Sequence, residues 1–277
     1  MLICDRGWLR AHMQQGLAIL AINVCDLSSM RAAIKAAAEV QAPLLLAIGE
    51  RYLSQAPLDA MAALARALDK EHSFPLGLHL DHARSLDTVR AALDAGFTSV
   101  MFDGSALPWH ENIGRTAEVV RMAGAYGAAV EGELGGLNDE HGGGACGPLT
   151  DPGQASEFAA QTGVDLLAVS VGNRHGLYEN EPRLELDLVG EIAVRTRCPL
   201  ALHGCSGIPL PQLRQGAALG IRKFNLNTEI AMAGAKMALA SGAKRMDSLL
   251  AAAEEGMRIA AVPYFIMLSG KEADPDV

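Results

Sequence analysis

The chain has 277 residues, half of them hydrophobic, with 23 basic and 32 acidic side chains and a net charge of −9. The pI near 5.4 argues against a nucleic-acid-binding surface, which needs clustered Lys and Arg. The apolar run at residues 17–24 is too short to span a bilayer, and the five cysteines form no C-x-x-C pair. We therefore expect a cytoplasmic protein that lacks a disulfide framework and binds neither nucleic acid nor membrane.

Short apolar segments alternate with longer amphipathic ones along the chain. Short apolar runs flanked by Gly, Pro, Asp or Asn are typical of buried parallel strands. We expect strands at residues 18–23, 43–48, 76–81, 99–102, 129–134, 165–171, 199–203 and 223–226. We expect helices at residues 28–41, 57–72, 86–95, 111–126, 152–162, 186–196 and 209–219, and a longer one from about residue 228 toward 257.

Eight strands that alternate with eight helices, without a linker between them, predict an α/β protein with a TIM (β/α)₈ barrel. The barrel is expected to be a single domain over residues 1–277, with a C-terminal helical extension from about residue 228. The alternative is an open, doubly wound sheet. Against it, no G-x-G-x-x-G motif follows the first predicted strand.

Polar residues occur where the predicted strands end, which is where a TIM barrel builds its active site. Asp81 and His82 end the third strand, His175 follows the sixth, and His203 ends the seventh. Three histidines at one end of a barrel can surround a single ion, and catalytic zinc commonly has three protein ligands and an open position. The alternative for each histidine is an ordinary hydrogen-bonded side chain.

Other polar residues are predicted to point into the barrel. Side chains alternate along a strand, so His79 shares the inner face of the third strand with Asp81. His79 is expected to be an inner-layer residue rather than a ligand. Asp81 is either a partner of an imidazole or a proton-transfer group. Glu131 and Glu133 share one face of "VEGEL" and are both expected to point inward.

Glycine-rich turns lie beside two of the histidines. Gly172 and Gly176 bracket His175, the segment "GCSG" follows His203, and "NLNT" ends the eighth predicted strand. Loops after the last strands of a TIM barrel often bind phosphate through backbone N–H groups. The combination predicts a phosphate subsite next to the histidines.

At these residues the sequence resembles the class II fructose- and tagatose-bisphosphate aldolases. The blocks H-L-D-H, G-N-x-H-G and L-H-G-x-S-G occur in this order, and the similarity covers roughly residues 1–235. The length is closer to that of the shorter, tagatose-type members. The resemblance implies a metal-dependent lyase that reversibly cleaves a ketose 1,6-bisphosphate to dihydroxyacetone phosphate and an aldehyde. It also implies one Zn²⁺ per subunit, a monovalent cation near the phosphate, and a homodimer or homotetramer.

The resemblance assigns roles to individual positions. It implies that His82, His175 and His203 bind the zinc and that Asp81 exchanges a proton with the hydroxyl of the cleaved bond. Glu133 matches a carboxylate associated with a second or alternative metal position in some members. The segments implied to hold dihydroxyacetone phosphate contain Gly176, Gly204, Cys205, Ser206, Asn225, Leu226, Asn227 and Thr228.

The sequence also departs from the family pattern. Cys205 stands where glycine is usual, and Asn227 where aspartate or alanine is common. The loop 135–151 differs from the usual segment, so Asp139 and Glu140 are the candidates for the mobile acidic group. The departures leave open an aldolase for another ketose 1-phosphate with an unphosphorylated aldehyde product. Because a fold does not determine a function, a catalytically silent sugar-phosphate-binding protein is the other alternative. Lys223 would be the nucleophile of a Schiff-base aldolase, but the histidines favour the metal route.

Overall fold

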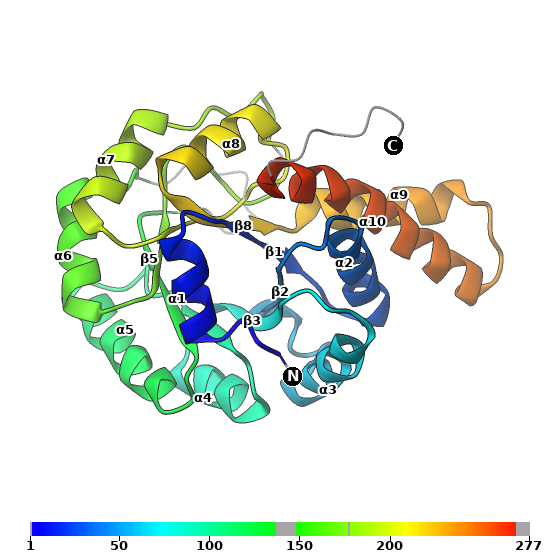
Figure 1. Ribbon diagram of the computed structural model, residues 1–277, viewed down its shortest axis with the longest axis horizontal. Coiled ribbons are helices and arrows are strands. Elements are labelled where there is room, and N and C mark those ends of the chain that lie inside the picture. Colours follow the sequence, from blue (N-terminus) through cyan, green and yellow to red (C-terminus); the bar gives the residue numbers. More distant parts are fainter. Residues whose placement is uncertain (1, 137–147, 177, 270–277) are drawn as a thin grey trace.

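The computed structural model describes residues 2–136, 148–176 and 178–269. Eight parallel strands pair in chain order and close into a barrel, because β1 pairs with both β2 and β8 (Figure 1). The strands are β1 (Ile19–Asn23), β2 (Leu44–Gly49), β3 (Leu76–Ala83), β4 (Ser99–Phe102), β5 (Ala129–Leu134), β6 (Leu166–Val169), β7 (Leu200–Leu202) and β8 (Ile221–Leu226). The predicted TIM barrel is confirmed, and the open sheet is wrong.

Helices follow the strands and surround the barrel. They are α2 (Leu27–Val40), α3 (Leu58–Leu68), α4 (Leu86–Ala95), α5 (Trp109–Gly124), α6 (Pro152–Thr162), α7 (Leu186–Thr196) and α8 (Leu210–Leu219), with 3₁₀ turns η1 (Glu50–Tyr52) and η2 (Asp69–Glu71). Local chemistry fixes their ends, as α4 illustrates. The Ser85 side chain accepts the N–H of Thr88 at its start, and Gly96 ends it at φ 90°.

Two hydrophobic layers hold the barrel together. The larger one packs outward-facing strand residues such as Leu78 and Leu80 against the helices. The inner layer contains several small side chains, which are Ala21, Ala47, Ala129, Ala168 and Ala201. Small inner residues leave space inside the barrel for longer polar side chains. His79, Glu131 and Lys223 occupy that interior and are fully buried.

An additional helix, α1 (Arg6–Gln14), lies across the end of the barrel at which the strands begin (Figure 1). Its Leu9 and Met13 belong to the inner hydrophobic layer. Arg6 Nε donates to Asp165 at 3.0 Å, immediately before β6. No helix was predicted at residues 6–14. α1 closes this end of the barrel and leaves the carboxyl ends of the strands for a site.

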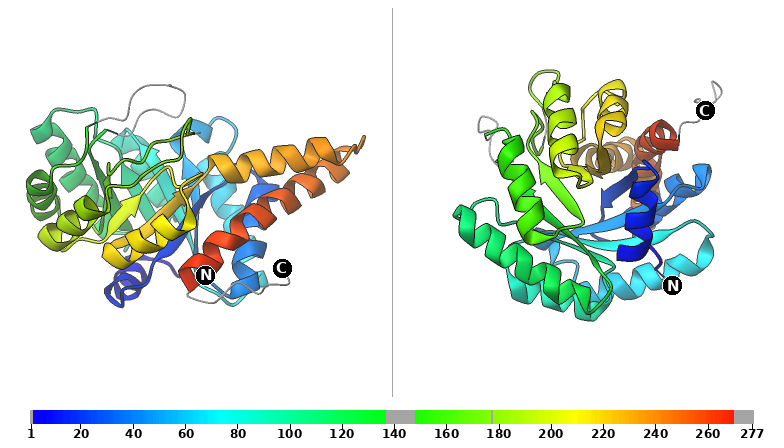
Figure 2. Two further views of the ribbon diagram at one scale, coloured as in Figure 1. Left: turned by 90° about the horizontal axis from the view of Figure 1, so that it is seen from above. Right: turned by 60° about the vertical axis from the view of Figure 1, so that its left-hand side comes forward.

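The single long helix expected over residues 228–257 is wrong. The segment forms α9 (Thr228–Ala240) and α10 (Met246–Ser269), and Gly242 adopts φ 62° in the turn between them. The two helices pack side by side and extend away from the barrel, while α10 also packs on α2 (Figure 2). The approach is close, because a Cβ on Gly256 would lie 2.6 Å from the carbonyl oxygen of Ala233.

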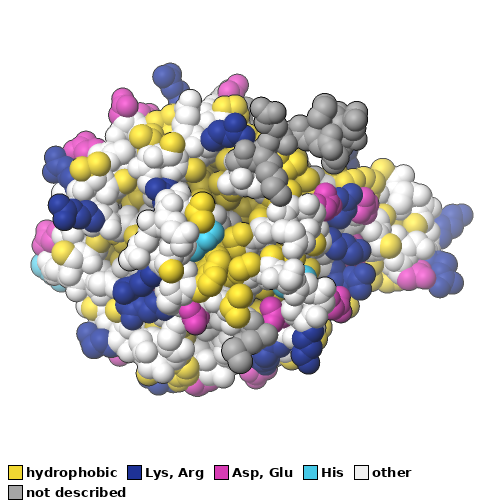
Figure 3. Space-filling model, viewed as in Figure 1, with side chains coloured by type: hydrophobic (Ala, Val, Ile, Leu, Met, Phe, Trp, Pro, Cys, Tyr) yellow, Lys and Arg dark blue, Asp and Glu magenta, His cyan; other side chains and the backbone are white. Residues whose placement is uncertain are grey.

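The surface carries charges of both signs. On the face shown in Figure 3, Lys and Arg side chains are interspersed with Asp and Glu and do not gather into one basic patch. In the described part of the chain, no helix has both the length and the hydropathy that a membrane span requires.

Candidate active site

Three imidazoles meet at the carboxyl ends of β3, β6 and β7. Ligand atoms of His82, His175 and His203 all lie within 4.8 Å of one another. The ring centroid of His82 is 4.9 Å from that of His175 and 4.7 Å from that of His203. This spacing is what three ligands of one divalent ion require, so the donor set fits a catalytic zinc with an open coordination position.

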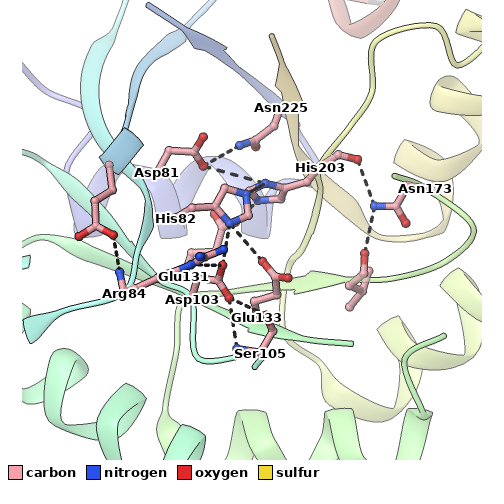
Figure 4. Close-up of polar contacts among 12 residues, drawn as sticks. Asp81, His82, Arg84, Asp103, Ser105, Glu131, Glu133, Asn173, His203 and Asn225 are labelled. Atoms are coloured by element: carbon pink, nitrogen blue, oxygen red, sulfur yellow. Dashed lines mark hydrogen bonds and ion pairs between the residues drawn. The ribbon is translucent and has the colours of Figure 1, made fainter. Parts of the chain in front are cut away.

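His203 is held by a buried carboxylate. Its Nε2 donates to Glu131 Oε1 at 2.6 Å, and its Nδ1 lies 2.9 Å from Nε2 of His82 (Figure 4). A carboxylate that accepts one ring N–H fixes the tautomer and leaves the other nitrogen for a metal. Nδ1 of His203 is therefore the nitrogen available to a metal.

His82 reaches the site through an unusual backbone conformation. Successive side chains of a regular strand point to opposite faces, so Asp81 and His82 should diverge. His82 instead adopts φ 51°, and the register of β3 against β4 shifts between Leu80 and Ala83. The left-handed residue turns the imidazole toward the site, where Asp103 Oδ2 lies 3.2 Å from its Nδ1.

Asp81 lies beside the imidazoles and accepts two amide hydrogen bonds. Asn23 Nδ2 donates to Oδ2 at 2.8 Å, and Asn225 Nδ2 donates to Oδ1 at 3.2 Å. Burial raises the pKa of Asp81, but His82, His203 and Lys223 outweigh burial and hold that pKa well below its ordinary value. The carboxylate is thus ionised and oriented, as a proton acceptor requires.

Glu133 belongs to a second group of potential ligands. It lies with His82 and Asp103, with ligand atoms within 4.8 Å of one another. Burial, together with the neighbouring Asp103, raises the pKa of Glu133 to about 8. Burial lowers the pKa of His82, but Asp81, Asp103 and Glu133 together raise it to about 9. This concentration of carboxylates around one imidazole suits a cation, although His82 is shared with the first group.

We expect Glu133→Gln to stabilise the metal-free protein increasingly as the pH rises from 5 to 8. The folded-state pKa of Glu133, about 8, lies above the unfolded value of 4.5. Over this pH range the unfolded state therefore releases the proton while the folded state keeps it, which stabilises the unfolded state of the wild type relative to the folded state. The gain at pH 8 should be on the order of a few kcal/mol. Urea unfolding at both pH values measures it.

The matched control for this measurement is Glu118→Gln, because Glu118 is an exposed glutamate on α5. It should change the stability at neither pH. An equal gain at pH 5 and pH 8 for Glu133→Gln would show that the effect is not the titration of this carboxyl.

A small cavity opens beside Asp81, His175 and His203. Six of the predicted substrate-binding residues line it, namely Gly176, Gly204, Ser206, Asn225, Asn227 and Thr228. Gly204 has φ 63°, and a Cβ there would lie 2.0 Å from the carbonyl oxygen of Arg174, so only glycine fits this turn. The cavity therefore combines amides, a hydroxyl and tight glycine turns next to the imidazoles.

Two other predicted substrate-binding residues contribute no side chain to the cavity. Cys205 and Leu226 are buried in the outer hydrophobic layer. The thiol of Cys205 donates to the carbonyl of Leu202, and its backbone N–H donates to the carbonyl of Asn225. The thiol thus points away from the imidazoles. Asp139 and Glu140, the candidates for a mobile acidic group, lie outside the described residues.

Several site residues were not identified as such from the sequence. Asp103, at the end of β4, contacts His82, and Asn23, at the end of β1, contacts Asp81. Their position directly at strand ends was the available signal. Glu131 and His79 were correctly predicted to be buried in the barrel, but the contact of Glu131 with His203 was not. Lys223 Nζ lies 2.8 Å from Glu131 Oε2.

Known proteins are similar to this chain in sequence and in fold. The family model for class II fructose-bisphosphate aldolase matches residues 6–272. The chain is 39% identical over 236 residues to the D-tagatose-1,6-bisphosphate aldolase subunit GatY of Klebsiella oxytoca, covering 84% of this chain and 83% of that protein.

Solved structures of aldolases are also similar to this chain. The crystal structure of the YdjI aldolase from Escherichia coli K12 is similar with a TM-score of 0.85 and 30% identity over 97% of both chains. A fructose-bisphosphate aldolase from Campylobacter jejuni has a TM-score of 0.80 over 97% of this chain and 94% of that chain, and at 21% identity this likeness concerns the fold alone. The chain therefore belongs to the class II fructose-bisphosphate aldolase family, whose members are divalent-metal-dependent carbon–carbon lyases.

Proposed function

We propose that the protein is a zinc-dependent aldolase that reversibly cleaves a ketose 1,6-bisphosphate of the tagatose or fructose type. The products are dihydroxyacetone phosphate and an aldehyde. The observation that carries the proposal is the convergence of His82, His175 and His203 next to Asp81, at the mouth of the glycine-lined cavity. The relation to a tagatose-bisphosphate aldolase supports the choice of substrate class.

The three histidines would hold the ion, with Nδ1 of His203 and Nε2 of His82 directed at it because their other nitrogens face Glu131 and Asp103. When bound, the zinc supplies a Lewis acid that polarises the ketose carbonyl and stabilises the enediolate. We also expect a second cation, which His82, Asp103 and Glu133 would bind. A monovalent cation near the phosphate is a further expectation.

Asp81 performs the proton transfer in this proposal. During cleavage, the hydroxyl at the far side of the breaking carbon–carbon bond must lose its proton. The lowered pKa of Asp81 keeps its carboxylate ionised and able to accept that proton. In the direction of condensation the same carboxyl returns the proton to the new hydroxyl. Asn23 and Asn225 hold both oxygens, so the carboxylate keeps one orientation.

The phosphate of dihydroxyacetone phosphate would lie at the other end of the cavity. The Ser206 Oγ accepts the N–H groups of Asn227 and Glu229 at the start of α9, so its own hydrogen can be donated to a ligand. Gly176 and Gly204 bring their backbones close to the same space. The helix dipole of α9 adds favourable potential for an anion.

Removal of the metal tests the proposal. We expect the chelated protein to lose cleavage of tagatose and fructose 1,6-bisphosphate and to regain it when Zn²⁺ is added back. The reason is that none of the described side chains lining the site is a Lewis acid that could replace the metal. A coupled assay for dihydroxyacetone phosphate measures cleavage, alongside metal content by mass spectrometry. Full activity of the metal-free protein would contradict the proposal.

A second experiment, borohydride trapping, addresses the Schiff-base alternative. Lys223 is fully buried, with its Nζ 2.8 Å from Glu131 and 2.7 Å from Asn225 Oδ1. An ammonium held in this way is a poor nucleophile. Borohydride treatment in the presence of substrate should therefore leave the protein unmodified, whereas a lysine-based aldolase would be trapped.

The lining of the cavity favours a second candidate function. Among its described residues there is no Lys or Arg. A bisphosphate carries a second anionic group, so this lining supports cleavage of a ketose 1-phosphate with an unphosphorylated aldehyde. The substrate panel of the chelation experiment should contain both kinds of ketose phosphate. Binding of a sugar phosphate by calorimetry without turnover of any of them would instead indicate a silent binding protein.

We expect a homodimer or homotetramer. The projecting pair α9 and α10 supports it, because apolar side chains on these helices are exposed to solvent. These are Met232, Met237, Leu239, Met246, Leu250 and Ile259. Exposed apolar surface of this kind is typical of interfaces between subunits.

A further inference from the structure

We propose that Lys223 is a positioning residue that holds the metal-binding and proton-transferring parts of the site in one fixed arrangement. It contacts no substrate itself. The inference rests on the proposed function, because it concerns the residues that would bind zinc and move the proton. The observation behind it is a fully buried lysine whose ammonium group contacts one residue from each part.

Both contacts are short and lie inside the barrel. Lys223 Nζ is 2.8 Å from Glu131 Oε2 and 2.7 Å from Asn225 Oδ1. Lys223 and Asn225 are two residues apart on β8, so alternation places both on its inner face. All three side chains are buried. A buried charge of this kind needs partners on every side, which fixes the positions of those partners.

The first contact leads to the metal ligand. Glu131 uses Oε2 for Lys223 and Oε1 for the Nε2 of His203. His79 Nε2 lies 4.0 Å from Glu131, but its Nδ1 lies 2.6 Å from Ser99 Oγ, so His79 is a weaker partner for the carboxylate. Without the lysine, the Glu131 carboxylate would be buried without its counter-ion. It would then move toward other donors, and His203 would lose its fixed orientation.

The second contact leads to the proton-transfer group. An amide has one acceptor and one donor end, and an ammonium can only donate. Lys223 therefore forces the Oδ1 of Asn225 to face it, and the Nδ2 of Asn225 must point to Asp81 Oδ1. Without the lysine, the Oδ1 of Asn225 would be buried without a donor, so the amide could swing toward another donor and withdraw its Nδ2 from Asp81 Oδ1. Lys223 thus selects the amide orientation that Asp81 needs.

Three variants separate the two contacts. They are Lys223→Met, Glu131→Gln, and the double variant that combines both changes. In the double variant no buried charge is left unpaired at this position, and the Oε1 of the glutamine can still accept the N–H of His203. Asn225, however, still lacks the lysine. Zinc affinity, measured by competition with a chromophoric chelator, reports on the contact of Lys223 with Glu131. The kcat reports on the contact of Lys223 with Asn225.

We expect Lys223→Met to weaken zinc binding by roughly 10- to 100-fold, as loss of a group that supports a ligand does. We expect the zinc affinity of the double variant to lie within a few-fold of that of Glu131→Gln. Its kcat should nevertheless stay at least ~10-fold below that of Glu131→Gln, with a smaller change in KM, because Asp81 remains misoriented. A purely structural role of the lysine would not give this split between zinc affinity and turnover.

Two results would overturn the proposal. One is wild-type zinc affinity in Lys223→Met. The other is an equal kcat for Glu131→Gln and the double variant, a comparison that still decides if Lys223→Met alone does not fold. If the wild type cleaves no ketose phosphate, the proposed function fails. The zinc affinities of the same proteins then still decide whether Lys223 orients the ligand.

Discussion

Replacing His203 by alanine should reduce cleavage at least ~10³-fold, because polarisation by the metal supplies several kcal/mol of transition-state stabilisation. His203 is 1% exposed, and its Nδ1 is one of the nitrogens that converge on the metal position. His82 and His175 alone would leave two protein ligands, one fewer than catalytic zinc sites usually have. We therefore also expect the variant to be purified with little zinc.

His203→Ala needs a control in which a histidine outside the site is removed. His110 on α5 is exposed and belongs to neither of the two candidate metal groups, so His110→Ala should keep both zinc and activity. Because His203→Ala also removes the partner of Glu131, its thermal unfolding must be recorded to separate loss of metal from loss of fold. A folded variant with one zinc per chain and wild-type kcat would show that His203 is not a ligand.

The barrel could be predicted because its signals are local. Buried parallel strands are short apolar runs, and each is interrupted by turn residues that do not depend on distant contacts. The predicted strand at 99–102 and helix at 86–95 agree with β4 and α4 residue for residue. Elements that depend on tertiary packing were missed. α1 is a short helix of mixed polar and apolar residues, and it is fixed by Leu9 and Met13 inside the barrel.

The turn between α9 and α10 could not be predicted for a different reason. From residue 228 onward the sequence is rich in alanine and methionine, so helix propensity continues almost without interruption across Gly242. One glycine in such a segment is compatible with a continuous helix. The chain turns there because α10 can then pack against both α9 and α2. That gain comes from contacts that no local pattern contains.

In the site, the histidines could be predicted, but the contacts that orient them could not. Strand alternation correctly placed His79 and Glu131 inside the barrel. The same rule would have sent His82 away from Asp81, and only its left-handed backbone brings both to the site. The pairing of Glu131 with His203 joins β5 to β7, and the pairing of Asn23 with Asp81 joins β1 to β3. Such pairs follow from barrel closure, which the sequence pattern implies without giving distances.

Asp81→Asn should lower kcat by ~10²- to 10⁴-fold, the range typical of a lost general base. Asparagine has nearly the shape of aspartate but cannot accept the substrate proton at neutral pH. One of its groups is an amide donor, so it would also face the Nδ2 of Asn23 or of Asn225 and lose one of the two hydrogen bonds. The three histidines are unchanged, and zinc content should be retained.

Retention of zinc is what distinguishes Asp81→Asn from His203→Ala. Loss of the hydrogen bond alone can be measured with Asn23→Ala, which leaves the carboxylate in place and should cost less in kcat than Asp81→Asn. If both variants lost activity equally, Asp81 would be acting through its contact with Asn23 rather than as the proton acceptor. If Asp81→Asn lost its zinc, the carboxylate would belong to the metal site, and another group would have to accept the proton of the cleaved bond.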